Sequence, residues 1–317
     1  MCTFNGAAFL PEQLASIAAQ SQRPFEIVAF DDGSCDQTVD LLRKFQAEHP
    51  DLNMRVEINQ SRLGPSANFQ QAIAACGGEI IALCDQDDVW APEKLAVIAE
   101  EFARNPALGL VFSDAEICNE AGSPLGYRLW KSVGFDGRLQ RRFRRGGAFD
   151  VILRQNLVTG ATVAFAASMR DLVLPIDTRW MHDGWIALLI AAVAPVSAMP
   201  APLVRYRQHP NQSIGALKRT LYQQYLNARK LDGRWFAMQS TLYQAAMDRL
   251  VSPAAEKFPV MPRNLHLLRA KISHWRRRSA IRDRKIARLV PSISEFLSLR
   301  YRRFSLGWKS FAQDLFL

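Results

Sequence analysis

Short apolar runs alternate with segments of helical spacing along the first 115 residues. Each run ends in polar turn residues, as expected of buried strands, and the four runs are residues 26–30, 54–59, 79–84 and 109–113. Between them, apolar positions three and four residues apart predict helices over residues 36–48, 64–75 and 92–104. Strands that alternate with helices predict an α/β fold with a mostly parallel sheet.

The pattern changes in the second half of the chain. Residues 127–150 are basic and Gly-rich and predict a loop, whereas residues 156–167 are strand-like. Residues 181–194 predict a buried helix and residues 203–206 a last strand. From about residue 216 the chain becomes helical and basic, with 21 Lys and Arg against 6 Asp and Glu, so we expect a boundary near residue 215.

One uncharged stretch, residues 184–204, is nominally long enough to span a bilayer. Pro195, Pro200 and Pro202 interrupt it, so we expect a buried helix followed by a strand instead of a membrane span. The first ten residues lack the charged and apolar regions of a secretory signal. The expected location is therefore the cytoplasm, with peripheral contact at the inner face of the cell membrane left open.

The composition excludes several classes of protein. The chain has 317 residues, of which 49% are hydrophobic and 22% are charged, which excludes a disordered or collagen-like chain. Its five Cys include no CxxC pair, which indicates a reducing compartment and no zinc ribbon. Residues 1–126 carry 7 Lys and Arg against 19 Asp and Glu, whereas residues 127–317 carry 33 against 11. An acidic half suits a metal ion, and a basic half suits phosphates or an anionic membrane.

Acidic residues gather at the predicted carboxyl ends of the strands, where α/β sheets bind ligands. They are Asp31, Asp32, Asp85, Asp87, Asp88 and Asp114. Carboxylates crowded in the motif DQDD at residues 85–88 repel one another, and a hard cation such as Mg²⁺ or Mn²⁺ relieves that repulsion. Read alone, the motif also fits an acidic turn that caps the next helix.

Three further motifs carry side chains that could take part in binding or catalysis. The motif DDGS at residues 31–34 is a tight turn whose free side chains could bond a base or a ribose. Asp183, just before a buried helix, is either its N-cap or a general base. In RYRQHPN at residues 205–211, the Arg side chains and His209 could meet a diphosphate, and His209 could also bind a metal or be structural.

Together these motifs resemble glycosyltransferase family 2, especially its bacterial rhamnosyltransferase-like members, over about residues 1–215. Seven segments carry the resemblance in order: CTFNG at 2–6, DDGSCD at 31–36, the stretch 59–73, CDQDDVWAPEKL at 84–95, TG at 159–160, HDGW at 182–185 and RYRQHPN at 205–211. The resemblance implies a GT-A fold, with a Rossmann-like nucleotide-sugar half over about 1–115 and an acceptor half over about 116–215. Residues 216–317 form a basic helical region outside it.

The resemblance also implies roles for particular residues. Those implied to bind the nucleotide sugar are Thr3, Asn5, Asp31, Asp32, Asp85 and Arg207. Asp87 and His209 would bind Mg²⁺ or Mn²⁺, and Asp183 would be the catalytic base that deprotonates the acceptor hydroxyl. Gly160 and Trp185 would lie on the acceptor side. The implied reaction is an inverting transfer from a nucleotide sugar, of which dTDP-rhamnose is one candidate, to a saccharide or lipid-linked acceptor of bacterial surface polysaccharide.

Alternatives remain open at this stage. Met1 stands where the family's first strand should end, so either the start site is misassigned or the first strand is truncated, and a catalytically inactive membrane-associated binding protein is one alternative. A nucleotidyltransferase is another, although no Gly-rich phosphate loop is present. Basic residues interleaved with aromatic ones over residues 272–317 suit peripheral membrane contact or a solvated helical tail. No nucleic-acid-binding motif accompanies the charge, so nucleic acid is not an expected partner.

Overall fold

The computed structural model describes residues 1–210, 229–283 and 288–316. Its N-terminal part is a three-stranded parallel sheet in the order β1-β2-β3, formed by β1 (Cys2–Thr3), β2 (Ile27–Asp31) and β3 (Met54–Ile58). The helices α1 (Leu10–Ala18), α2 (Thr38–Glu48) and α3 (Pro65–Ala75) connect or flank these strands. The predicted strand and helix pattern of this part is confirmed.

A second, six-stranded sheet continues from the first. Its order is β4-β8-β6-β9-β5, with β7 paired to β6. The strands are β4 (Ile80–Ala82), β5 (Val89–Trp90), β6 (Leu110–Cys118), β7 (Pro124–Arg128), β8 (Val163–Ala166) and β9 (Val196–Arg207). Only β6 and β9 pair in parallel, so this sheet is mixed. The two sheets meet where the backbone N–H of Cys2 donates to the carbonyl of Cys84 at 3.2 Å.

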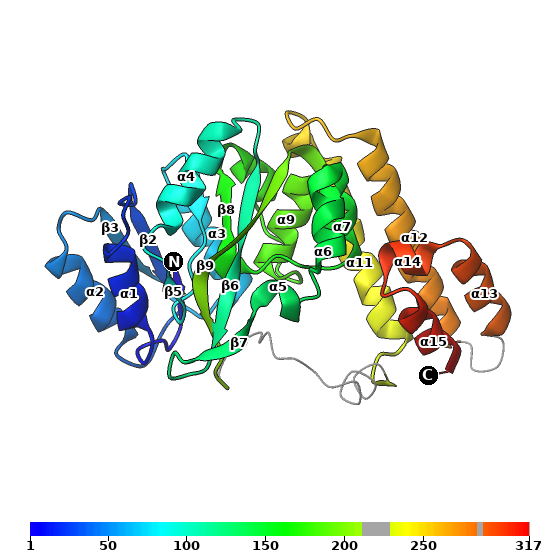
Figure 1. Cartoon of the computed structure of the whole chain (residues 1–317), viewed down its shortest axis with the longest axis horizontal. Helices are drawn as coiled ribbons and strands as arrows, with labels where there is room; N and C mark the ends of the chain where they lie inside the picture. Colours follow the sequence, from blue (N-terminus) through cyan, green and yellow to red (C-terminus); the bar gives the residue numbers. More distant parts are fainter. Residues whose placement is uncertain (211–228, 284–287, 317) are drawn as a thin grey trace.

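Helices cover the sheets on both sides (Figure 1). α4 (Lys94–Arg104) follows β5, and α9 (His182–Val193) follows the short α8 (Arg170–Val173). α9 is apolar on nearly every side, which is typical of a fully buried helix. The uncharged stretch 184–204 is divided between α9 and β9, as predicted. Among the described residues, none of the helices combines the length and the hydropathy needed to cross a bilayer.

The prediction of a loop over residues 127–150 is wrong. The segment contains the end of β7, followed by α5 (Leu129–Ser132), α6 (Gly137–Arg142), a short π-helical turn (Phe143–Gly147) and the start of α7 (Ala148–Arg154). Trp130, Phe135 and Phe143 of this segment are buried and pack on Phe112 of β6, with ring centroids 5.6 to 5.8 Å apart. Exposed Arg residues stand between these aromatic residues in the sequence, so no regular apolar spacing is visible there.

The C-terminal helices pack on α7 and α9 through α11, α12 and α14 (Figure 1). They are α11 (Gly233–Leu250), α12 (Pro262–Asp283), α13 (Leu289–Leu297), α14 (Arg300–Phe304) and α15 (Trp308–Phe316). Phe236 and Leu268 of these helices share one hydrophobic core with Ile186 and Leu189 of α9. The predicted boundary near residue 215 lies outside the described residues.

Candidate active site

A cavity of about 410 Å³ lies at the carboxyl ends of β1 and β4 and extends to the start of α9. Seven of the eleven predicted site residues line it: Thr3, Asp32, Asp85, Asp87, Gly160, Asp183 and His209. They come from six separate segments of the chain, so the fold brings together motifs that are as much as 200 residues apart. The other four, Asn5, Asp31, Arg207 and Trp185, are not among its lining residues.

The DQDD turn is held from both sides. On one side, the side-chain amide of Gln86 donates to the carbonyl of Phe4 at 3.0 Å and accepts from the Phe4 N–H at 2.8 Å. Gly6 leaves room for this amide, since a Cβ at Gly6 would lie 2.2 Å from Oε1 of Gln86. On the other side, the Nε of Arg207 donates to the carbonyl of Asp87 at 2.9 Å. These contacts fix the direction in which the turn presents its carboxylates.

Arg207, which was predicted to bind the nucleotide sugar, does not line the cavity. Its side chain is buried and donates to the backbone carbonyls of Asp87 and Glu120 and to the carboxylate of Glu12. Its backbone N–H donates to Oδ1 of Asp88 at 3.0 Å. Arg207 therefore positions the DQDD turn from behind.

Burial and mutual repulsion raise the proton affinity of the acidic turn. Burial, followed by the charges of Asp87 and Asp183, raises the pKa of Asp85 to about 7. Burial also raises the pKa of Asp88, whose Oδ2 atom has no hydrogen-bond partner among the described residues. Lys94 lies nearby, but it is buried, its ammonium donates to the carbonyl of Ala161 at 2.8 Å, and burial lowers its pKa to about 8. The cavity therefore has an excess of negative charge that a bound cation would relieve.

Asp87 and His209 form a donor pair on the cavity wall. The Nε2 atom of His209 lies 2.8 Å from Oδ2 of Asp87, and both residues line the cavity. One carboxylate and one imidazole suit Mn²⁺, and Mg²⁺ typically takes one or two protein ligands beside substrate phosphates and water. Within the ranges that the structure describes, no group of three or more His, Cys, Asp or Glu is arranged to hold a metal ion. The pair therefore fits a cation that takes its remaining ligands from a bound diphosphate.

Asp31, the first residue of the DDGS motif, mainly orders the turn that contains it. Asp31 is fully buried and accepts from the hydroxyl of Thr3 at 2.8 Å and from the backbone N–H and hydroxyl of Ser34 at 2.7 and 2.6 Å. Asn5 lies outside the cavity, where its side-chain oxygen accepts from the N–H of Cys35 at 2.9 Å. Asp31 and Asn5, which were predicted to bind the nucleotide sugar, do not line the cavity, and both side chains order the turn at residues 31–35.

Asp32, in contrast, faces the cavity and orders one of its walls. Its carboxylate accepts from the backbone N–H groups of Leu63 and Gly64 at 2.7 and 2.8 Å and from the amide of Asn59 at 3.0 Å. This loop carries Arg62, whose guanidinium lies 3.9 Å from the centre of the Phe4 ring. Arg62 and Phe4 therefore give this end of the cavity an aromatic surface and a positive charge.

Asp183 lies in the first turn of α9 and lines the cavity. The N-cap of the helix is Met181, so Asp183 is not the N-cap. Its carboxylate accepts from the N–H groups of Gly160 at 3.1 Å and Gly184 at 2.5 Å and from the amide of Asn156 at 3.3 Å. These donors and the positive end of the helix dipole fix an exposed carboxylate edge at the cavity.

Close packing beneath Asp183 explains the glycine at position 160. A Cβ at Gly160 would lie 2.7 Å from Nε2 of His182. The His182 ring stacks on Phe69, with centroids 3.9 Å apart, and burial lowers its pKa. Gly160 therefore supplies a backbone N–H to Asp183 and leaves the space that the His182 ring occupies.

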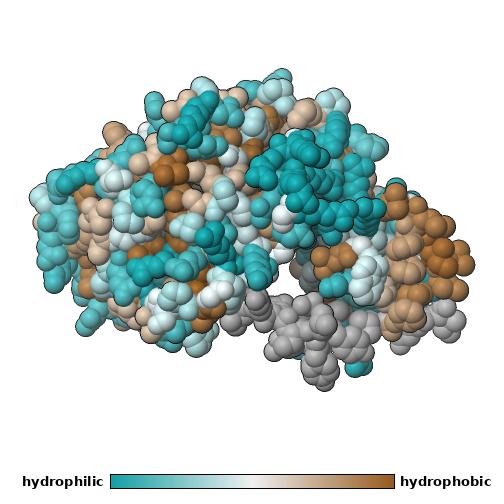
Figure 2. All heavy atoms as spheres, viewed as in Figure 1, coloured by the Kyte–Doolittle hydropathy of each residue, from teal (hydrophilic) through white to brown (hydrophobic). Residues whose placement is uncertain are grey.

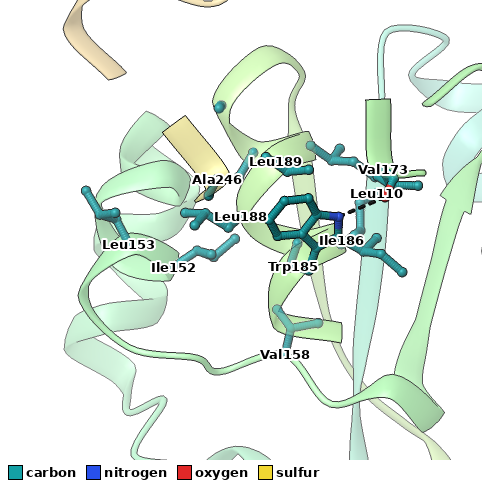
Figure 3. Packing of buried hydrophobic residues seen from close by; sticks show 14 of the residues in the cluster. Leu110, Ile152, Leu153, Val158, Val173, Trp185, Ile186, Leu188, Leu189 and Ala246 are labelled. Atoms are coloured by element: carbon teal, nitrogen blue, oxygen red, sulfur yellow. Dashed lines mark hydrogen bonds between the residues drawn. The ribbon is translucent and has the colours of Figure 1, made fainter. Parts of the chain in front are cut away.

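Trp185, which was predicted to lie on the acceptor side, does not line the cavity. Its side chain points into the core, where the indole N–H donates to the carbonyl of Val173 at 2.8 Å among aliphatic residues of α7 and α9 (Figure 3). Asp114, expected at the acidic edge, lies within β6 and accepts from the N–H groups of Ala115 and Trp130 at 2.9 Å. Both residues have structural roles, because the indole N–H of Trp185 and the carboxylate of Asp114 are hydrogen-bonded to backbone groups.

Several cavity residues were not predicted from the sequence. Gln86, Arg62, Asn156 and His182 line the cavity beside the predicted residues. A signal existed for His182 and Gln86, because both stand next to a predicted acidic residue in HDGW and DQDD. No local signal marks Arg62 or Asn156, because their roles depend on segments that are distant in the sequence.

Comparisons with known proteins identify the family of the chain. Residues 1–157 match Glycosyl transferase family 2. An uncharacterized glycosyltransferase of Nostoc sp. is 36% identical over 234 residues, which cover 70% of this chain and 67% of that protein. An uncharacterized protein of Mycobacterium tuberculosis is 26% identical over 329 residues, covering 99% of this chain and 85% of the relative. The dTDP-rhamnosyl transferase RfbG of Shigella flexneri is 33% identical over 99 residues, or 30% of this chain and 34% of that protein.

Solved glycosyltransferase structures share the fold. The TarS fragment 1–349 of S. aureus, solved in complex with UDP, has a TM-score of 0.51 at 17% identity, with 88% of both chains covered. A mannosyltransferase of Pyrobaculum calidifontis, solved with GDP-Man and Mn²⁺, has a TM-score of 0.52 at 18% identity, with 99% of this chain and 84% of that chain covered. The predicted GT-A fold is thus confirmed. The chain belongs to glycosyltransferase family 2.

Proposed function

We propose that the chain transfers a sugar, with inversion, from a nucleotide-diphosphate sugar to a saccharide or lipid-linked acceptor of bacterial surface polysaccharide. One observation carries the proposal: Asp85, the pair Asp87 and His209, and Asp183 line a single cavity. Such a site needs a place for a nucleotide, a cation site for a diphosphate and a base for an acceptor hydroxyl. We assign Asp85 to the nucleotide, the pair Asp87 and His209 to the cation, and Asp183 to the base.

The nucleoside end of the cavity is proposed to be the wall formed by Thr3, Phe4, Asp32 and Arg62. The Phe4 side chain lines the cavity and offers an aromatic surface for a base, and Arg62 lies over the same ring at 3.9 Å. Asp85 would accept from the ribose hydroxyls. Neighbouring structures support a nucleotide donor, since TarS was solved with UDP-GlcNAc and the P. calidifontis mannosyltransferase with GDP-Man. We propose dTDP-rhamnose as the donor because RfbG of Shigella flexneri is a dTDP-rhamnosyl transferase.

Asp87 and His209 are proposed to hold Mg²⁺ or Mn²⁺. When bound, the cation would offset the negative charge of the leaving nucleoside diphosphate. The chain's own contribution is the placement of this pair, which depends on Arg207 behind the turn and on the Gln86 amide in front of it. The raised pKa of Asp85 fits the same proposal: burial is its main cause, and the charges of Asp87 and Asp183 add repulsion where the cation would bind.

Asp183 is proposed to be the catalytic base. Its carboxylate would take the proton of the acceptor hydroxyl as that oxygen forms a bond to the anomeric carbon of the donor. The bond from the anomeric carbon to the phosphate oxygen breaks at the same time, and the nucleoside diphosphate leaves with the electron pair. A single displacement of this kind inverts the anomeric centre. Gly160, Gly184 and Asn156 hold the carboxylate by three hydrogen bonds, so its orientation is set before the acceptor binds.

A donor panel tests the proposal. The full chain is incubated with dTDP-rhamnose, UDP-GlcNAc and GDP-mannose, with Mn²⁺ and a mixture of saccharide acceptors, and release of the nucleoside diphosphate is followed. We expect metal-dependent release from one donor and no release by the Asp87→Asn variant. Release that is equal in both proteins, or the same with a chelator, would reject the proposed site.

A further inference from the structure

Helices α13 and α15 turn their polar sides toward the protein. In α13 the fully buried residues are Ser292 and Glu295, and in α15 the buried residues are Ser310 and Asp314. A surface helix of a water-soluble domain normally buries its apolar side. These two helices have the opposite orientation.

Buried ion pairs hold α13 and α15 in this orientation. Arg278 of α12 makes a two-point contact with Asp314, through Nε at 2.6 Å and Nη2 at 2.8 Å. Glu295 accepts from Arg277 at 2.9 Å and lies 2.8 Å from Nδ1 of His274. Turning either helix over would leave these buried charges without partners, which is strongly destabilising. The inverted orientation is therefore built into the packing.

The outward sides are strongly apolar as a consequence. Of the 16 large hydrophobic side chains that are exposed in the described part of the chain, nine lie between residues 289 and 316. They are Leu289, Val290, Ile293, Phe296, Leu297, Leu299, Leu306, Trp308 and Phe316. We call these nine residues the apolar face. Figure 2 shows hydrophobic atoms gathered over α13 at the C-terminal end of the molecule.

Positive charge borders the apolar face. Arg302, Arg303 and Lys309 of α14 and α15 are exposed. Arg303 also contacts the buried carboxylate of Asp150, which lines a surface cavity together with Arg138, Arg141, Arg142, Arg145 and Arg263. The basic surface is therefore continuous from α6 to α14.

We propose that the apolar face inserts into the interface of an anionic lipid bilayer, with the bordering Arg and Lys side chains at the lipid phosphates. Exposed apolar patches rimmed by charge mark protein or membrane contacts, and basic residues beside an apolar helix side favour anionic lipid. A second copy of the chain fits less well, because a two-fold contact through this face would bring like-charged arginines together. The inference goes beyond the transfer reaction and does not depend on its donor.

The inserted region is smaller than the sequence predicted. The expected contact spanned residues 272–317, but Arg278 and Arg282 of α12 are buried and paired inside the helical bundle. Residues 284–287 and 317 lie outside the described structure. The membrane contact we propose therefore involves α13 to α15 and excludes α12.

Vesicle flotation with the full chain tests this inference. The probes are vesicles of phosphatidylcholine mixed with phosphatidylglycerol and vesicles of phosphatidylcholine alone. We expect the wild-type protein to float with the anionic vesicles. The triple variant Val290→Asp, Leu297→Asp, Trp308→Asp should stay in the dense bottom fraction of the gradient. The matched control is Phe25→Asp. Phe25 is 74% exposed, close to the 76% of Val290, but it lies far from the apolar face in the sequence. The control should float like the wild type.

A charge variant separates insertion from misfolding. Replacing Arg302 and Lys309 by Gln removes two positive charges without touching the apolar face, and each removed charge should lower partitioning by about fivefold, or about 25-fold together. Circular dichroism confirms that each variant is folded. Three outcomes would overturn the inference: no flotation of the wild type, equal flotation of all variants, or a dimer that Val290→Asp disperses in protein that does not bind vesicles.

Discussion

The imidazole of His209 lies 2.8 Å from the carboxylate of Asp87, although 122 residues separate them in the chain. The contact joins the turn after β4 to the end of β9, and both side chains face the same cavity. The contact places one nitrogen atom and one oxygen atom side by side. In the proposed site, a cation would bind to these two atoms and to the diphosphate of the donor.

Replacing either member of this pair should remove metal-dependent nucleotide binding. We expect Asp87→Asn and His209→Asn each to weaken binding of a nucleoside diphosphate with Mn²⁺ by at least about tenfold, or about 1.4 kcal/mol, while binding without metal changes little. His266→Asn, an exposed histidine outside the cavity, is the matched control. Isothermal titration calorimetry with and without chelator measures the effect. Affinity that is unchanged by both substitutions would exclude the pair as the metal site.

Asp183→Asn should abolish transfer and preserve donor binding. The amide fills the same space but cannot take the acceptor proton, so we expect turnover to fall by about 10²–10⁴-fold. Asp40→Asn, on the exposed side of α2, controls for a general loss of charge. Turnover by the Asp183 variant near the wild-type value would assign the base to another residue.

Gly160→Ala should impair transfer through His182. The new Cβ would lie 2.7 Å from Nε2 of His182, so either the ring or the loop must move, and the loop carries the N–H that holds Asp183. We expect turnover to fall by about 10–100-fold, because small misplacements of a catalytic group have large effects. Gly78→Ala is the control, since its Cβ would meet only ordinary contacts at 3.7 Å. A Gly160 variant as active as the control would show that the loop accommodates the methyl group.

The Asp85 carboxyl should lower the stability of the ligand-free protein as the pH rises from about 4 to about 7, whereas the buried His182 and His274, whose pKa values are lowered, act in the opposite direction. Asp85 has a native pKa of about 7 against an ordinary value of 3.8, so the folded state binds more protons than the unfolded state in this window. Folding stability therefore decreases with increasing pH across the window and is flat outside it for this group. Differential scanning fluorimetry of the wild type and Asp85→Asn checks this, and the substitution should reduce the slope. A wild-type slope of opposite sign that the substitution removes would contradict the burial of a protonated Asp85.

Trp185→Ala should affect stability and leave substrate recognition intact. The side chain is buried in the core, so truncation should lower the free energy of unfolding by about 3–5 kcal/mol. Trp185→Phe should cost less and keep the wild-type KM for donor and acceptor. Urea denaturation and steady-state kinetics separate the two effects. A raised acceptor KM in the Phe variant, at normal stability, would return Trp185 to the acceptor site.

The fold was predictable wherever a whole element is apolar or periodic. Residues 26–30 and 181–194 are examples, because a buried strand or helix must be apolar on nearly every side. The segment 127–150 was not predictable in this way. Its buried side chains, among them Phe135 and Phe143, are isolated aromatics separated by solvent-facing arginines, and short helical turns have too few positions to show a period.

The site was predictable as a set of motifs and less so residue by residue. Asp85, Asp87, Asp183 and His209 line the cavity as expected, because each is a short polar side chain at the end of a strand or the start of a helix. Arg207 stands in the same motif as His209, but its long side chain turns to the carbonyls behind the DQDD turn. The direction of such a side chain depends on distant partners, which a local pattern does not reveal.

The most direct test of the central claim is calorimetric titration of the full chain with dTDP, UDP, GDP and CMP, each with and without Mn²⁺. The site described above predicts tight binding of one nucleoside diphosphate only when the metal is present, and loss of that binding in Asp87→Asn. Absence of binding for every nucleotide, or binding of equal strength with and without metal in both proteins, would contradict a metal-dependent nucleotide-sugar site in this cavity.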